Sequence, residues 1–331
     1  RKQPQKIESE TIRTMIFNKD NDGAKEIQTL VGTYFQSNDF AVIESEINSA
    51  SRTIRKLIGP GIFDRAEKYY RTPEFTAQDG GIDSQLVTAI QTAIAQLAMV
   101  RFYQQNILSH EDGGRKVKIH EESEKMPWQW QYDRDDQALL DKYYRSLDEL
   151  YTFLEEEQIE EWKTSPLRQK LAECFIKDLD TFQAVFPLED SPRMFYILVP
   201  FMLEAQDRII RPIVGEEAFE RMKAGDIGED LAEQFATAKL CIPLYAVITA
   251  VKRMSVKILP TMIVRRFSDS FQGGRGGNID DAATRKLLCT LEQEATDAKT
   301  ELQKAVTNRR NPARHVALLP DNDPSKKYCL T

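Results

Sequence analysis

Histidine is scarce in this sequence, and its cysteines are isolated from one another. Only three histidines are present, so general acid–base chemistry by imidazole has few candidates. The four cysteines stand singly and never approach a CxxC spacing, so we interpret them as thiols, three in helices and one in a tail. The motifs SxxK, GxSxG and HExxH are missing. We therefore expect no enzyme activity, no bound cofactor and no catalytic, cofactor-binding or metal-ligating residues. The histidines and cysteines are His110, His120, His315, Cys174, Cys241, Cys289 and Cys329.

The chain also lacks a strong charge bias and a long uninterrupted apolar run. Its formal net charge is -7, with both signs interleaved, which gives no general indication of a nucleic-acid partner. The N-terminal sequence RKQPQKIESETIR has no apolar run after its basic residues, and the most apolar windows, near 195–203 and 240–264, contain or adjoin charged residues. We expect neither secretion nor membrane insertion. A hydrophobic content of 41% over 331 residues is enough for more than one folded core.

Helix periodicity is the dominant pattern that is present. Apolar residues recur at spacings of three and four, which predicts a mainly α protein. Long amphipathic helices are expected over about 84–108, 134–158 and 280–307, and from 229 onward, where Pro243 should kink or delay the helix. A further helix should end at the Gly59-Pro60-Gly61 break. One face of that helix is marked by Phe40, Ile43, Ile47, Ile54 and Ile58.

Two distant segments of the sequence are similar, and together they are here called the doubled phrase. RTIRKLIGPGIFDR at 52–65 matches RIIRPIVGEEAFER at 208–221 without a gap, at an offset of 156 residues. In both copies we expect a glycine, Gly59 or Gly215, to cap a helix and a phenylalanine, Phe63 or Phe219, to anchor the core just beyond it. The pattern predicts two similar, duplicated helical domains at 1–160 and 161–310, followed by an extended tail at 311–331.

Each predicted half contains a glycine turn between polar, extended-looking segments. We expect short β-hairpin-like arms near 109–123 and 265–279. His110 and His120 lie beside carboxylates in the first arm, but a solvated polar arm is favoured over a metal site because no i, i+4 pairing is present. GGRGG at 273–277 resembles a phosphate loop, yet RRFSDSFQ precedes it and no Gly-Lys-Ser/Thr ending follows, so a turn is favoured over nucleotide binding.

Aromatic and basic residues outside the periodic helices are the candidates for an interface. In MPWQWQYD, Trp128 and Trp130 either pack onto the core at the start of a helix or anchor a partner, and we favour packing. The basic patches either contact phosphates or an acidic protein, or are ordinary surface charges, and the latter is favoured. The candidate interface residues are Trp128, Trp130, Arg265, Arg266, Phe267, Phe271, Arg275 and Tyr328.

Several segments together resemble a known family. KMPWQWQYDRDDQALLDKYYRSLDELYTFLEE, FQAVFPLEDSPRMFYILVPFMLEAQDRIIRPIVGEEAFERM and the closing DNDPSKKYCLT are similar to proteins of phages and prophages of Bacteroidota, encoded among virion head and neck components. The resemblance covers roughly 40–331. The first copy departs from the pattern, with Lys56 in place of Pro212. The family's recurrent positions are met by Pro127, Trp128, Arg193, Phe195, Pro212, Ile213, Val214 and Gly215.

The resemblance implies a head–tail connector, or neck ring, of a tailed phage. Such a protein is a non-enzymatic virion component that forms a homo-oligomeric ring between portal and tail. Its partners would be itself, the portal and other neck or tail proteins, with DNA passing through the ring without sequence-specific binding and with no membrane contact. It would be in the host cytoplasm during assembly. The alternatives are an intracellular helical scaffold or adaptor of a mobile element outside the virion, and a nucleotide-binding enzyme that uses the glycine turn at 273–277.

Overall fold

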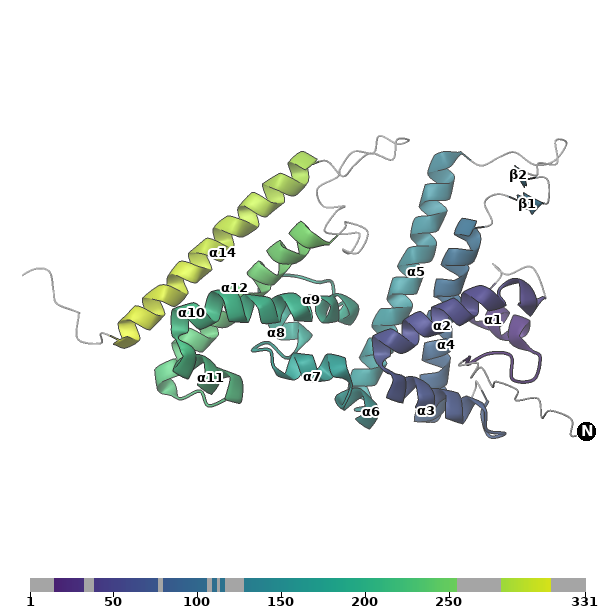
Figure 1. Ribbon diagram of the computed structural model, residues 1–331, viewed down its shortest axis with the longest axis horizontal. Helices are drawn as coiled ribbons and strands as arrows, with labels where there is room; N and C mark the ends of the chain where they lie inside the picture. The colour runs from purple at the N-terminus through teal and green to yellow at the C-terminus, as the bar shows by residue number, and fades with distance from the viewer. Residues whose placement is uncertain are drawn as a thin grey trace, which may run out of the picture. The chain divides into compact units, whose positions relative to one another are not determined.

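The computed structural model describes residues 15–32, 39–76, 80–105, 109–111, 114–116, 128–254 and 281–310, and within these ranges the chain is mainly helical (Figure 1). It divides into two compact units. The first contains the described residues up to Ala172 together with Ser191–Tyr196, and the second contains Glu173–Asp190 and the described residues from Ile197 onward. Helices α6 (Glu160–Lys163) and α7 (Pro166–Ala172) are therefore grouped with the first unit.

The first unit is built around one long central helix. Helix α4 packs against α5, α2, α3 and α1, and Figure 1 shows α4 and α5 running side by side. Its alanines and branched residues are buried on almost every side from Leu86 to Val100, as expected for a helix surrounded by others. The elements are α1 (Gly23–Val31), η1 (Phe40–Val42), α2 (Glu44–Ile58), α3 (Pro60–Tyr70), α4 (Ile82–Gln105), β1 (Ser109–Glu111), β2 (Gly114–Lys116), α5 (Gln129–Glu156), α6 (Glu160–Lys163) and α7 (Pro166–Ala172).

The second unit also has a long apolar helix with a long partner. Helix α12 packs along α14, and α10 contacts α14 as well. Pro243 lies buried inside α12, which begins at Glu229, so the proline does not delay the helix. The elements are α8 (Leu179–Gln183), the part of α9 (Pro192–Ala205) from Ile197 onward, the π-helical turn η2 (Gln206–Ile210), α10 (Arg211–Val214), α11 (Glu216–Ala224), α12 (Glu229–Arg253) and α14 (Asp281–Arg310).

Helices α4 and α12 are, among the described residues, the two that are long and apolar enough to cross a membrane by length and composition. Most of the apolar stretch of each is buried within the structure. The core helix of a globular protein passes the same test, and burial against α5 and α14 accounts for the composition of both.

The two matching glycines adopt the same backbone conformation. Gly59, between α2 and α3, has φ 98° and ψ 149°, and Gly215, between α10 and α11, has φ 86° and ψ 160°. In each case the glycine N–H donates to the arginine carbonyl four residues earlier at 3.0 Å, from Gly59 to Arg55 and from Gly215 to Arg211. Few residues other than glycine tolerate this conformation. Each glycine thus ends one helix and lets the next short helix begin at the following residue, Pro60 or Glu216.

A phenylalanine follows each glycine turn at the same distance. The backbone N–H of Phe63 donates to the Gly59 carbonyl, and that of Phe219 donates to the Gly215 carbonyl. Both rings are fully buried. In the second unit the Arg211 guanidinium lies over the Phe219 ring, 4.3 Å from its centroid.

A short antiparallel ladder occupies part of the connection between α4 and α5. Ser109 pairs with Lys116, His110 with Arg115 and Glu111 with Gly114. These six residues cover part of the arm predicted at 109–123. The remainder of that arm, the arm at 265–279 and the tail at 311–331 lie outside the described residues, so the two arms remain a prediction.

One of the three cysteines that were expected in helices lies outside a helix. Cys174 lies in a bend between α7 and α8 and not in a helix, whereas Cys241 and Cys289 are in α12 and α14. The helix prediction failed at Cys174 because its apolar neighbours Phe175 and Ile176 are buried from an irregular segment. Burial raises the pKa of the Cys174 and Cys241 thiols to about 12 in each case, so both are protonated at neutral pH.

Candidate functional site

The start of α5 presents two tryptophans to solvent. Trp128 is 73% exposed and Trp130 is 51% exposed, so the favoured prediction, that they pack onto the core at the start of the helix, is wrong. The pattern misled because aromatic residues before a helix usually cover apolar surface, whereas here the buried stripe begins further along, at Leu139. Large exposed aromatic side chains are typical of binding surfaces.

Hydrogen bonds fix the backbone that carries these indoles. The Trp128 N–H donates to the side-chain oxygen of Gln131 at 2.8 Å, and the Gln131 N–H donates to the Trp128 carbonyl at 2.8 Å. This reciprocal pair satisfies backbone groups that a helix start otherwise leaves open. The tryptophans therefore project from an ordered helix terminus.

The rest of α5 anchors that terminus to the first unit. Buried residues recur along one face of α5 every three or four positions, and that face packs on α4. Arg134, one turn beyond Trp130, is exposed, as is its neighbour Asp135. The surface formed by Trp128, Trp130, Arg134 and Asp135, here called the tryptophan surface, thus combines two indoles with charges of both signs. The buried residues of α5 are Leu139, Tyr143, Ser146, Leu147, Leu150, Tyr151 and Leu154.

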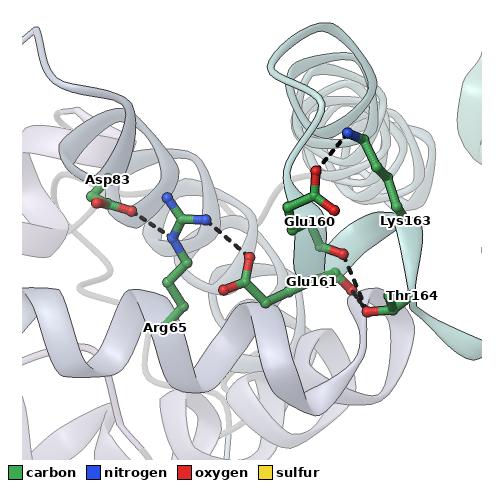
Figure 2. A network of polar contacts seen from close by, with 6 residues as sticks. All are labelled: Arg65, Asp83, Glu160, Glu161, Lys163 and Thr164. Atoms are coloured by element: carbon green, nitrogen blue, oxygen red, sulfur yellow. Dashed lines mark hydrogen bonds and ion pairs between the residues drawn. The ribbon is translucent and has the colours of Figure 1, made fainter.

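A second polar cluster is formed around Arg65 in α3 (Figure 2). Its Nε donates to Asp83 Oδ1 of α4 at 2.7 Å, and its Nη1 donates to Glu161 Oε2 of α6 at 2.9 Å. The hydrogen bond that Arg65 donates to the Asp83 carboxylate is the largest cause of the raised pKa of the Arg65 guanidinium. The nearby Lys163 forms an ion pair with Glu160 of its own helix, at 2.8 Å. Arg65 therefore fastens α3 to α4 and α6, which is a structural role.

The second unit has an ion pair at the corresponding place. Arg221, which matches Arg65 in the doubled phrase, donates from Nη1 to Asp230 Oδ2 at 3.0 Å. Asp230 is the second residue of α12, just as Asp83 is the second residue of α4. The sequence does not predict this correspondence, because Asp83 lies 18 residues after Arg65 whereas Asp230 lies 9 residues after Arg221.

Arg193 and its neighbours hold the first turn of α9 against α5. Asp148 Oδ1 of α5 accepts from the Ser191 hydroxyl at 2.7 Å and from the Arg193 N–H at 2.9 Å. The Arg193 guanidinium lies over the Tyr144 ring, 4.1 Å from its centroid. Burial raises the pKa of the Asp148 carboxyl, while the bond from Ser191 partly opposes that shift. Arg193 and Phe195, singled out by the family resemblance, are thus buried contacts of the fold.

An aromatic cluster continues this contact toward the end of α5. Glu155 accepts from Trp162 Nε1 at 2.7 Å and from the Tyr196 hydroxyl. The Tyr151 ring packs against both Trp162 and Tyr196. The polar groups of Glu155, Trp162 and Tyr196 have partners inside the first unit, so this cluster has a structural role.

A shallow hollow of about 330 Å³ opens between α4 and α5. Its hydroxyl groups are engaged with their own helices: Thr92 donates to the Thr88 carbonyl at 2.8 Å, and Ser146 donates to the Tyr143 carbonyl at 2.7 Å. Glu149 is its one ionisable side chain. This hollow contains no pairing of a nucleophile with a base. Its lining residues are Gln85, Thr88, Ala89, Thr92, Ser146, Glu149 and Phe153.

All the other predicted interface residues lie outside the part of the chain that the structure describes. Arg265, Arg266, Phe267, Phe271, Arg275 and Tyr328 lie outside the described residues, as do His120, His315 and the glycine turn at 273–277. Within the part of the chain that is described, no group of three or more His, Cys, Asp or Glu side chains is arranged to hold a metal ion.

The tryptophan surface is therefore the strongest candidate site in the described structure. Comparison with known proteins adds no identification, because no family model, no curated protein and no solved structure matches the chain.

Proposed function

We propose that this chain is a duplicated helical protein of a tailed-phage virion, a head–tail connector that assembles as a ring between portal and tail. The observation that carries the proposal is the exposure of Trp128 and Trp130 on an ordered helix terminus. Exposed indoles in a fixed geometry suit burial against another protein surface. The resemblance to neck components in the sequence supplies the class of assembly.

Equivalent local geometry in the two units supports the duplication. Gly59 and Gly215 share one unusual conformation, and the ion pairs Arg65–Asp83 and Arg221–Asp230 tie the helix after each glycine to the next long helix. Only glycine readily adopts such backbone angles, so their recurrence at the matched position supports descent from one domain.

The correspondence extends upstream of the doubled phrase. Ile16 and Phe17 precede α1 in the first unit, and Phe175 and Ile176 precede α8 in the second. All four are buried. Each proposed copy thus consists of a buried apolar segment, a short helix, a helix that ends at glycine, another short helix and two long helices.

The charge of the chain is compatible with a channel for DNA. A ring lumen rich in unpaired lysine and arginine would hold the phosphates, whereas a net charge of -7 disfavours such binding. The proposal therefore assigns DNA no specific contact.

Mass spectrometry of purified particles, combined with light scattering of the purified protein with and without the portal, tests the proposal. We expect the protein in particles at a stoichiometry of several copies per portal ring, and an oligomer when the portal is present. Absence from particles together with a monomer in both samples would contradict the virion role. Absence from particles with stable self-association would favour the intracellular scaffold instead.

A further inference from the structure

The tryptophan surface has a chemical counterpart elsewhere in the chain. The sequence 133–136, Asp-Arg-Asp-Asp, contains three acidic side chains and one basic one, directly after Trp128 and Trp130. The closing sequence KKYCLT contains two lysines and a tyrosine and no acidic residue. Opposite charge beside aromatic residues is the pattern that favours docking of a basic, aromatic segment on this surface.

We propose that residues Lys326, Lys327 and Tyr328 of one copy dock on the tryptophan surface of a second copy. This inference rests on the proposed ring, because in a ring each copy offers a binding surface to one neighbour and binds the equivalent surface of the other neighbour. Tyr328 packs against the indoles, and the two lysine side chains lie near the aromatic faces and Asp135. The interaction is heterologous, so an open chain of copies has a free surface at one end and a free tail at the other until a ring closes.

The length of chain between α14 and this segment permits the contact. Helix α14 ends at Arg310, and Lys326 is sixteen residues further on. An extended chain spans at most about 3.3–3.6 Å per residue, so the segment can reach roughly 50 Å from the end of α14. That reach is larger than the diameter of a small helical domain, which is about 30 Å.

Tryptophan fluorescence measures the docking directly. Among the three tryptophans, Trp162 is buried with 1% exposed, so a change in emission reports on Trp128 and Trp130. The titrant is a peptide of residues 324–331 with blocked ends and serine in place of Cys329. The protein is the full chain with Lys326→Gln, Lys327→Gln and Tyr328→Ala, which leaves the surface open. We expect a saturable blue shift, and a peptide that causes none would overturn the inference.

Matched variants distinguish specific docking from non-specific hydrophobic binding of the peptide. Trp128→Ala with Trp130→Ala should weaken peptide binding at least tenfold, while Val42→Ala, which alters another half-exposed apolar side chain, should change it less than twofold. A peptide with both lysines replaced by glutamine should bind two- to fivefold more weakly and lose its dependence on salt. Equal binding to the double tryptophan variant would overturn the inference.

Mixing two full-length variants tests whether the tail acts between copies. One variant carries Trp128→Ala and Trp130→Ala, and the other carries the three tail substitutions. Each alone should fail to self-associate, and the mixture should form heterodimers, because one supplies the surface and the other the tail. A mixture that stays monomeric would overturn docking between copies. If docking fails while the wild-type protein is still found as a ring in particles, the docking inference is wrong and the proposed function is retained. If docking succeeds but particles lack the protein, the proposed function is wrong.

Discussion

At the scale of single residues, Gly59 and Gly61 form a matched pair. Gly59 has φ 98°, and a Cβ added there would meet only the Ser165 Cβ at 3.7 Å, so conformation and not space restricts it. We expect Gly59→Ala to lower the free energy of unfolding by about 1–3 kcal/mol, because the backbone angles are strained for an L side chain. Chemical denaturation monitored by circular dichroism measures the change.

Gly61 is the control for that substitution. It lies two residues later inside α3, and its added Cβ would contact the Glu161 side chain at an ordinary 3.6 Å. Gly61→Ala should be neutral or raise the free energy of unfolding by up to about 1 kcal/mol, since alanine favours helix. Equal destabilisation by both substitutions would show that the turn conformation is not the cause.

Arg65 provides a second residue-scale prediction. Arg65→Met should lower the free energy of unfolding by roughly 1 kcal/mol, because it removes two ion pairs whose side chains are about one-third exposed. Lys163→Met, which removes a local pair within α6, should lower it by less than about 0.5 kcal/mol. Urea denaturation compares the two, and similar losses would mean that the links from α3 to α4 and α6 contribute nothing beyond a local pair.

At the scale of elements, the start of α9 depends on a side chain from α5. Asp148→Ala should lower the free energy of unfolding by about 1–2 kcal/mol, because the Arg193 N–H and the Ser191 hydroxyl both lose their acceptor. Asp148→Asn keeps an acceptor oxygen without the buried charge, so it should cost less. Thermal denaturation at neutral pH distinguishes them, and an asparagine variant as unstable as the alanine variant would contradict this account.

The same carboxyl predicts a pH dependence. Burial raises the pKa of folded Asp148 above the ordinary 3.8, so the folded protein retains a proton that the unfolded chain releases. The stabilising contribution of this proton is complete below pH 3.8 and is lost as the pH rises through the folded pKa. The free energy of unfolding that Asp148→Asn loses relative to wild type should therefore shrink as the pH rises through that window, and a constant loss would contradict the raised pKa.

Helices with a regular apolar stripe were predictable from the sequence at this scale. The helix predicted at 84–108 is α4 at Ile82–Gln105, and the one predicted at 280–307 is α14 at Asp281–Arg310. Their periodicity directly reflects burial on one face or all round. The start of α5 lies five residues before its predicted position because the stripe begins only at Leu139, while Trp128 and Gln131 form the actual helix start.

Features that depend on distant contacts were not predictable. Gln91 of α4 donates to the carbonyl of Ile16 at 2.8 Å, which fixes an irregular segment that has no periodic pattern. The π-helical turn at Gln206–Ile210 arises where Gln206 reaches back to accept from the Phe175 N–H at 2.6 Å. Such bonds join residues far apart in the chain, and local spacing does not encode them. The sequence singled out Trp128 and Trp130 by residue type, but only the structure shows that their side chains are exposed.

At the scale of the whole molecule, the chain has two compact helical units, and the exposed tryptophan surface lies on the first. The hydrophobic face of each long helix is already used within its own unit, since α4 packs on α5 and α12 on α14. Assembly would therefore use side chains at helix ends, such as Trp128 and Trp130, and not the apolar faces of the long helices.

A reconstruction of the neck of a particle, by electron cryomicroscopy, tests the central claim most directly. The account predicts a ring between portal and tail in which every subunit fits two helical units, each with a pair of long antiparallel helices. It also predicts contact between the start of α5 in one subunit and its neighbour. A neck whose density is fully explained by other proteins, with no such ring, would contradict the account.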